Sequence, residues 1–380
     1  MNSLFSFLQG GALYVGVFLV VLTVLVFVHE LGHYLVARRN GVRIEIFSIG
    51  FGPELFGWWD RAGTRWKFSA IPLGGYVKMF GDADASSGLP ARGGQLTAAE
   101  REVSFHCKRL GQRAAIVAAG PAANFLFAIV VLALLFMTYG QPFTPAQVGQ
   151  VVPGSAAEAA GIRAGDEIVR IDGQAVERFE EVQQVVRLNP GVPMTMVVRR
   201  DDRLVDLHVT PNRVEENDRL GRREVGQLGV QGGAPRYVAH NPASAVVRAV
   251  GETWNLSAMT LHAVWQMIVG TRGSEELGGP LRIAQLSGEV AQGGVGPLLW
   301  FMAVLSINLG LINLFPVPVL DGGHLLFYAA EAIRGKPLGQ RAQEYGFRIG
   351  LALVLTLMVF ATWNDLVHTG LVDLVKRFVT

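Results

Sequence analysis

The sequence is poor in cysteine and in charge. Cys107 is the single cysteine among 380 residues, which excludes an internal disulfide framework, an iron–sulfur cluster and a zinc site built from several cysteines. Charged residues make up 17% of the chain, whereas average soluble chains carry about 25%. The net charge is only +2, so we expect no nucleic-acid partner.

Apolar residues, in contrast, make up 50% of the chain, and the mean hydropathy is +0.33. A membrane-spanning helix needs about 20 mostly apolar residues. Four stretches meet this need: 13–37, 114–139, 296–320 and 347–363. The first lacks the basic start and the cleavage site of a signal peptide, so we expect a retained span. The sequence therefore predicts a polytopic α-helical membrane protein with four transmembrane helices, in two membrane sections at 1–139 and 296–380.

Lys and Arg near the predicted span ends are distributed unequally. One side of the membrane has ten of them and the other has three. The ten are Arg38, Arg39, Arg43, Arg101, Lys108, Arg109, Arg113, Arg334, Lys336 and Arg341, and the three are Arg282, Lys376 and Arg377. Because positive charge gathers on the cytoplasmic side, we expect a multi-pass protein of the bacterial inner (cytoplasmic) membrane. Both termini and the 140–294 loop would then be periplasmic.

Two loops are predicted to fold. In the cytoplasmic loop, apolar and polar residues alternate over 65–70, and a second apolar pattern covers 44–51. This predicts a β-hairpin or small sheet over 43–79, associated with the membrane. In the external loop, the pattern Gly161-x-x-x-Gly165-Asp166-x-Ile168, followed by an Asp172-Gly173 turn, resembles a PDZ domain. The sequence therefore predicts one inserted periplasmic α+β domain over residues 146–232.

A further helical pattern covers residues 242–270. Its apolar residues recur at helical spacing, and Asn255, His262 and Gln266 interrupt them. An amphipathic helix at the membrane interface is the preferred interpretation. A fifth span is the alternative.

The first predicted span contains His29-Glu30-Leu31-Gly32-His33. Residues i and i+4 share one face of a helix, so the two imidazoles can bind one Zn²⁺. Ionisable residues at membrane depth are costly, and they are functional by default. A structural cluster of buried polar residues is the competing interpretation. The spacing predicts a zinc site near the cytoplasmic end of this span.

A zinc site needs a third protein ligand, and a catalytic one leaves the fourth position open for water. Asp321 is the only acidic residue in the interval 290–330, and it follows the third predicted span at the cytoplasmic end. Depth in the membrane therefore selects Asp321. His324 is a competing ligand, but Gly322-Gly323 should carry it out of the span. Without the zinc motif, Asp321 would be interpreted as a turn residue.

Taken together, these residues resemble the site-2 protease family of intramembrane zinc metalloproteases, closest to the bacterial regulator of sigma-E protease group. The resemblance covers nearly the whole chain. Its further motifs are Gly120-Pro121-Ala122-Ala123-Asn124, Asn313-x-x-Pro316-x-Pro318-x-Leu320-Asp321-Gly322, Phe47–Pro53 and Ile71–Met79. The best-known enterobacterial member has two tandem PDZ domains, whereas this chain has room for one.

The resemblance implies roles for single residues. His29, His33 and Asp321 would hold one Zn²⁺ per chain, and Glu30 would be the general base and later the acid. Asn313 would contact substrate, and Asn124 would help to build the catalytic core. Gly120 and Pro121 are interpreted instead as residues that let helices pack closely.

A substrate helix must unwind before its amides can be reached. The edge that includes Gly74, Gly75 and Tyr76 could pair with the unwound segment, and Pro316 and Pro318 would break the third span. The expected partners are lipid and single-pass membrane proteins, such as an anti-sigma factor of a stress response. The PDZ-like domain could also bind a peptide C-terminus, to which Leu228-Gly229-Val230 would contribute. The alternative function is a catalytically silent membrane scaffold, and a transporter is a third hypothesis without the repeated halves it needs.

Overall fold

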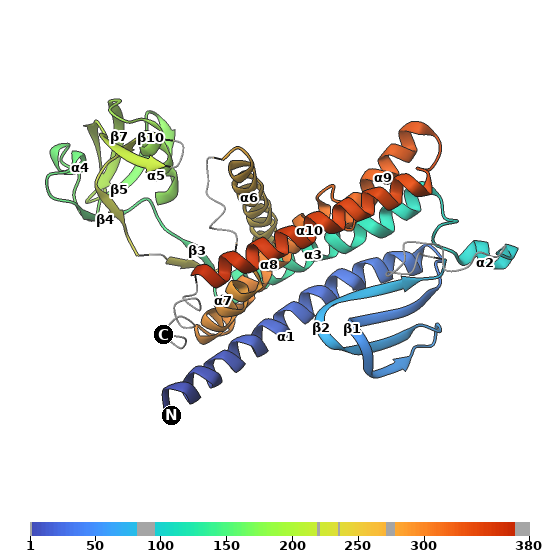
Figure 1. Ribbon diagram of the computed structural model, residues 1–380. Coiled ribbons are helices and arrows are strands. Elements are labelled where there is room, and N and C mark those ends of the chain that lie inside the picture. The colour runs from blue at the N-terminus through green and yellow to red at the C-terminus, as the bar shows by residue number, and fades with distance from the viewer. Residues whose placement is uncertain (1, 82–95, 219–220, 235, 271–277, 369–380) are drawn as a thin grey trace. The chain divides into compact units, whose positions relative to one another are not determined.

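Four helices of the computed structural model are long and apolar enough to cross a membrane (Figure 1). The structure describes residues 2–81, 96–218, 221–234, 236–270 and 278–368. The four helices are α1 (Asn2–Arg39), α3 (Leu110–Thr138), α8 (Val295–Leu314) and α10 (Gln340–His368). All four predicted spans are confirmed, so the chain is a multi-pass membrane protein. The end of the second predicted membrane section, 369–380, lies outside the described residues.

The predicted end of the third span is wrong. Helix α8 stops at Leu314, and Phe315 is already extended. Pro316 and Pro318 have no N–H for a helical hydrogen bond, so the apolar run up to residue 320 is not helical. A new helix, α9 (Asp321–Arg334), then begins at the acidic residue. Asp321 therefore opens a helix rather than closing the span.

Strands β1 (Ile44–Trp59) and β2 (Arg65–Met79) form the predicted antiparallel hairpin. Residues 44–49 of β1 pair with 75–79 of β2 on one side and with 65–68 on the other. Residues 54–59 also pair with 65–69. The two long strands thus make a sheet of four segments, in the order 75–79, 44–49, 65–68 and 54–59. Gly50 has a φ of +88° where β1 leaves its first partner, a conformation that glycine adopts readily.

Aromatic side chains join this sheet to α1. Phe47 is fully buried and stacks on Trp66 with ring centroids 4.2 Å apart, and Tyr34 of α1 meets the Phe47 ring edge-on. Asp60, in the turn between the strands, accepts hydrogen bonds from the Tyr34 hydroxyl at 2.9 Å and from the Trp66 indole at 3.1 Å. The sheet is therefore fixed to the end of α1 that carries His33 (Figure 1).

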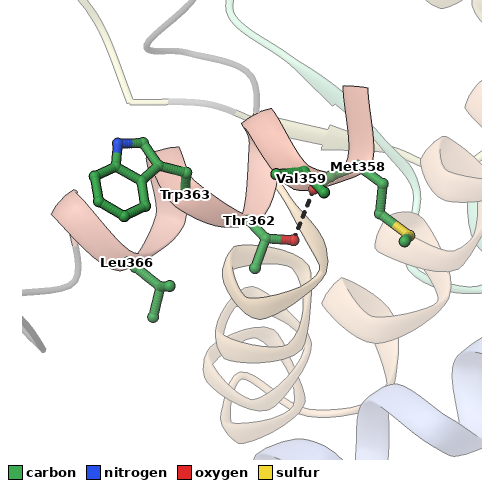
Figure 2. A pocket seen from close by; sticks show the side chains of 5 residues that line it. All are labelled: Met358, Val359, Thr362, Trp363 and Leu366. Carbon is green, nitrogen blue, oxygen red and sulfur yellow. Dashed lines mark hydrogen bonds between the residues drawn. The ribbon is translucent and has the colours of Figure 1, made fainter. Parts of the chain in front are cut away.

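Helices α3 and α1 pack closely at Gly32, where an added Cβ would lie only 2.7 Å from the Cβ of Ala123. Helix α7 (Pro280–Gln292) contacts α1, where Gly288 lies against the Tyr14 ring. Most apolar side chains of α10 are exposed, as expected for a helix that faces lipid. A shallow cavity of about 250 Å³ on α10 is lined by Met358, Val359, Thr362, Trp363 and Leu366 (Figure 2). No residue of the zinc motif lines it.

Two more helices of the described residues lie outside the PDZ-like domain. Helix α2 (Ala98–Val103) begins with a capping box between Thr97 and Glu100. Helix α6 (Pro242–Ile268) covers the predicted amphipathic segment. Among the described residues, α6 is not one of the helices apolar enough to span a membrane. Its position at the interface remains a prediction.

The predicted PDZ-like α+β domain is formed by the residues between α3 and α6. Its elements are β4 (Val148–Val151), α4 (Ala156–Ala159), β5 (Glu167–Ile171), β6 (Gln174–Ala175), α5 (Phe179–Leu188), β7 (Met194–Arg200), β8 (Arg203–Val209) and β11 (Val230–Gly232). Strands β6, β5, β7 and β8 form one sheet in that order, and β11 pairs with β4. A ribbon of β9 (Asn212–Asp218) and β10 (Gly221–Gln227) was not predicted. Short strands β3 (Gln141–Phe143) and β12 (Arg236–Val238) pair outside this domain.

An ion pair buried in the PDZ-like domain joins β7 to the start of β5. The carboxylate of Asp166 is 1% exposed and accepts two hydrogen bonds from Arg200, at 2.8 and 2.7 Å. Burial alone would raise the pKa of Asp166, but the hydrogen bonds from Arg200 and from the Arg163 backbone N–H, together with the Arg200 charge, outweigh burial and lower that pKa. The pair therefore stays ionised in the folded domain.

Candidate metal centre

The structure brings His29, His33 and Asp321 together. The Nε2 atom of His29 lies 3.1 Å from Oδ2 of Asp321, and Nε2 of His33 lies 3.4 Å from the same oxygen. The two Nε2 atoms are 3.2 Å apart. The histidines occupy one face of α1, and Asp321 comes from the first turn of α9. Three potential ligand atoms therefore converge from two helices.

Groups on α3 hold the opposite side of each imidazole. Nδ1 of His33 donates to the backbone carbonyl of Ile116 at 2.9 Å. Nδ1 of His29 lies 3.0 Å from the side-chain amide of Asn124, which is fully buried. The atom placed against His29 Nδ1 is Asn124 Nδ2, and Asn124 Oδ1 has no partner. Because the oxygen and nitrogen of an amide are assigned from its hydrogen bonds, the exchanged orientation, with Oδ1 toward His29 Nδ1, satisfies this buried oxygen. With that oxygen accepting from His29 Nδ1–H, both Nε2 atoms carry a lone pair directed at the centre of the cluster.

The cluster fits a divalent cation. Oδ2 of Asp321 is buried without a hydrogen-bond partner, and it faces two imidazole nitrogens. Such a set of acceptors is unfavourable unless a proton or a cation lies among them. Two histidine nitrogens and one carboxylate oxygen are ligands of catalytic zinc sites. His324, the competing ligand, is exposed and outside the cluster.

Gly120 lies at the cluster, a position that sequence reasoning missed. A Cβ at Gly120 would lie 2.5 Å from Cε1 of His33 and 2.9 Å from Cε1 of His29. The interpretation of Gly120 as a helix-packing residue was therefore incomplete, because its missing side chain makes room for both rings. Pro121 does pack on another helix, since its carbonyl would lie 3.3 Å from a Cβ at Gly310. The spacing Gly120–Asn124 is one helical turn, which was the available signal.

Glu30 lies between the cluster and strand β2. A Cβ at Gly75 would lie 3.3 Å from Cγ of Glu30, and the backbone of Val77 hydrogen-bonds to the Glu30 carboxylate. The 75–79 edge of the sheet is thus in contact with the residue next to His29. Gly74 has a φ of +123° and lies against the Phe51 ring, which stacks on Tyr76.

The other predicted site residues lie around the end of α8. The Asn313 amide donates to the carbonyl of Leu309 in its own helix at 3.0 Å. Pro316 and Pro318 belong to the non-helical segment between α8 and α9. In this structure, therefore, Asn313 and the two prolines precede Asp321 in the chain and do not belong to the His–Asp cluster.

Comparison with known proteins assigns the chain as a whole to a family. The model of peptidase family M50 matches residues 17–357. The chain belongs to peptidase family M50. A Rhizobium meliloti protein that carries a zinc metalloprotease name is 49% identical over 355 residues, which cover 92% of this chain and 95% of that protein. Metalloprotease MmpA of Caulobacter vibrioides is 41% identical over 374 residues, with 92% and 94% covered.

Membership in family M50 makes the protein a zinc metalloprotease of the site-2 protease type. Its cofactor is Zn²⁺. Among solved structures, the PDZ domain of an SdrC-like protein from Listeria innocua is 18% identical and has a TM-score of 0.20. The matched region covers 25% of this chain and 99% of the Listeria domain.

Proposed function

We propose that this M50 peptidase is an intramembrane endopeptidase of a bacterial inner membrane. Its substrates would be single-pass membrane proteins, cut within or near the transmembrane segment, such as an anti-sigma factor of a stress response after a first cut. One observation carries the proposal. The His29–His33–Asp321 cluster and Glu30 lie on or beside a membrane-spanning helix, next to the edge of a β-sheet.

In this proposal His29, His33 and Asp321 hold the Zn²⁺, and α3 keeps both imidazoles in the required tautomer. Zinc in such a site supplies a Lewis acid that activates water and polarises a carbonyl. Glu30 takes the proton from the attacking water and returns it to the leaving amine. Arg38 and Arg39 lie at the C-terminal end of α1, close in sequence to His33. Positive charge gathers on the cytoplasmic side of a membrane, which supports access of water to the site from that side.

The edge of β2 would hold the unwound substrate. A peptide bond inside a helix is protected by its hydrogen bonds, and exposed backbone in lipid is costly. Residues 75–79 pair on one side with 44–49, which supports addition of a substrate strand on the other. Because Gly75 and Val77 contact Glu30, such a strand would run past the catalytic carboxylate. Asn313 would satisfy a substrate amide once it leaves Leu309.

The test pairs the wild type with Glu30→Gln, both purified in detergent. Bound zinc and cleavage of a single-pass substrate without its ectodomain are measured for each. We expect one zinc per chain in both proteins and cleavage by the wild type only. The matched control is Glu344→Gln, an exposed carboxylate on α10, which should cleave normally. Absence of zinc from both proteins would support the silent scaffold instead.

The PDZ-like domain would meet the external end of the substrate. It would either bind a C-terminus made by the first cut or exclude substrates with large ectodomains. The Leu228-Gly229-Val230 segment, which leads into β11, supports the first role, since Gly229 has a φ of +81° like a loop that offers its N–H groups. Adding a C-terminal amide to a trimmed substrate separates the two. Slower cleavage would indicate binding, and unchanged cleavage a filter.

A further inference from the structure

An ion pair joins α3 to α9 at the far end of the helix that Asp321 begins. Nη2 of Arg113 lies 2.6 Å from Oε1 of Glu331, and the two side chains are only 14% and 17% exposed. The guanidinium also stacks 4.9 Å from the centre of the Tyr328 ring. We propose that Arg113 and Glu331 are positioning residues that hold Asp321 at the metal centre.

The spacing along α9 supports this role. Asp321, Leu325, Tyr328 and Glu331 are four and three residues apart, which puts them on one face of the helix. This face packs on the rest of the protein, since Leu325 and Tyr328 contact the hydrophobic cluster that contains Tyr34 and Ile116. Asp321 and Glu331 thus mark the two ends of one interface, about 15 Å apart along the helix axis.

Helix α9 needs a fixed point at its far end. The residues before it are non-helical, and Val319 has a φ of +124°, which a β-branched residue rarely adopts. Helix α9 therefore does not inherit its direction from α8. Gly322 and Gly323 fix its beginning by packing on the backbone of 314–318. The Arg113–Glu331 pair supplies the second point, and two points set the direction of a rigid helix.

The same face of α3 serves all three ligands. Arg113, Ile116, Gly120 and Asn124 follow one another at spacings of three and four residues. Ile116 orients His33, Asn124 orients His29, and Gly120 makes room for both rings. Through its ion pair with Glu331, Arg113 also holds α9, and with it Asp321, against this face of α3. The distance from the histidines to the carboxylate is therefore set through α3.

The test measures zinc affinity, by competition with a chelator, in the full chain purified in detergent. The variants are Arg113→Gln, Glu331→Gln and the swapped pair Arg113→Glu/Glu331→Arg. Loss of a group that hydrogen-bonds a ligand directly weakens metal binding about 10- to 100-fold. Arg113 and Glu331 act on Asp321 only through α9, so we expect the low end of this range, about 10-fold, for each single variant. The swapped pair should recover most of the affinity. The control is Glu344→Gln, which removes an equally short but exposed pair with Arg348 and should not change affinity.

Thermal unfolding of the zinc-free protein separates positioning from general stability. If Arg113→Gln or Glu331→Gln lowers the unfolding midpoint but binds zinc like the wild type, the pair is only structural and the proposal is wrong. If a single variant does not fold, Arg113→Lys keeps the charge but loses the planar fork. It should fold and bind zinc more weakly than the wild type. The inference rests on zinc binding at the cluster, so a wild type without zinc would refute the proposed function instead.

Discussion

Replacing Gly120 with alanine adds one methyl group at the metal centre. That methyl carbon would lie 2.5 Å from Cε1 of His33 and 2.9 Å from Cε1 of His29, whereas real Cβ contacts are essentially never below 3.0 Å. The His33 ring must therefore move by about 0.5 Å or more, or α3 must move away from α1. Ligand distances in metal sites tolerate only about 0.2 Å. Both movements are opposed by existing contacts. The carbonyl of Ile116 holds the far side of the His33 ring, and Gly32 of α1 already packs tightly on α3.

We expect Gly120→Ala to bind zinc at least 10-fold more weakly, comparable to loss of a ligand-orienting group, and to lose most cleavage activity. Zinc affinity is measured by chelator competition, and activity on a trimmed single-pass substrate. Gly111→Ala, on the same helix with open space around it, is the control. It should leave both quantities unchanged. Wild-type zinc affinity in Gly120→Ala would refute the described geometry of the site.

Three further perturbations test other parts of the structure. Burial alone would raise the pKa of Asp60, but hydrogen bonds from Thr64, Trp66 and Tyr34 lower it to about 2. Its contribution of about 1–2 kcal/mol is therefore fully present above about pH 4 and disappears as the pH falls through 2. In Asp60→Asn this acid-sensitive part should vanish from denaturation curves. Arg200→Met removes the charged partner of the buried Asp166 carboxylate, which keeps only the hydrogen bond from the Arg163 backbone N–H. It should destabilise the PDZ-like domain by about 3–5 kcal/mol, seen as faster hydrogen exchange over 146–232. Val77→Pro removes the backbone donor at Glu30 and should stop cleavage without loss of zinc, while Leu55→Pro on the opposite edge of the sheet should cleave normally.

The elements that sequence alone predicts are those whose physical signal is local. Four apolar stretches gave four spans, because length and hydropathy decide membrane insertion. The turn at Asp201-Asp202 between β7 and β8 also has a local signal, because aspartate adopts the positive φ of this turn more readily than most other residues. The β9–β10 ribbon carries no such signal. It is rich in charge and has no alternating apolar face, so its strands depend on pairing with each other rather than on burial.

Prediction of the metal centre divides along the same line. His29 and His33 follow from spacing in one helix, and depth in the membrane was enough to select Asp321. Depth in the membrane could not show that Asp321 begins a new helix. Hydropathy extends the span through Phe315–Leu320, but the prolines in this segment prevent a helical backbone there. Nor could depth find Gly120 or Arg113, whose roles exist only where α3 meets α1 and α9. The proposed ligands are thus encoded locally, but the distances between them are a property of helix packing. Substitutions on the face of α3 that includes Arg113, Gly120 and Asn124 should therefore change metal affinity more than substitutions elsewhere on that helix, such as Gly111→Ala.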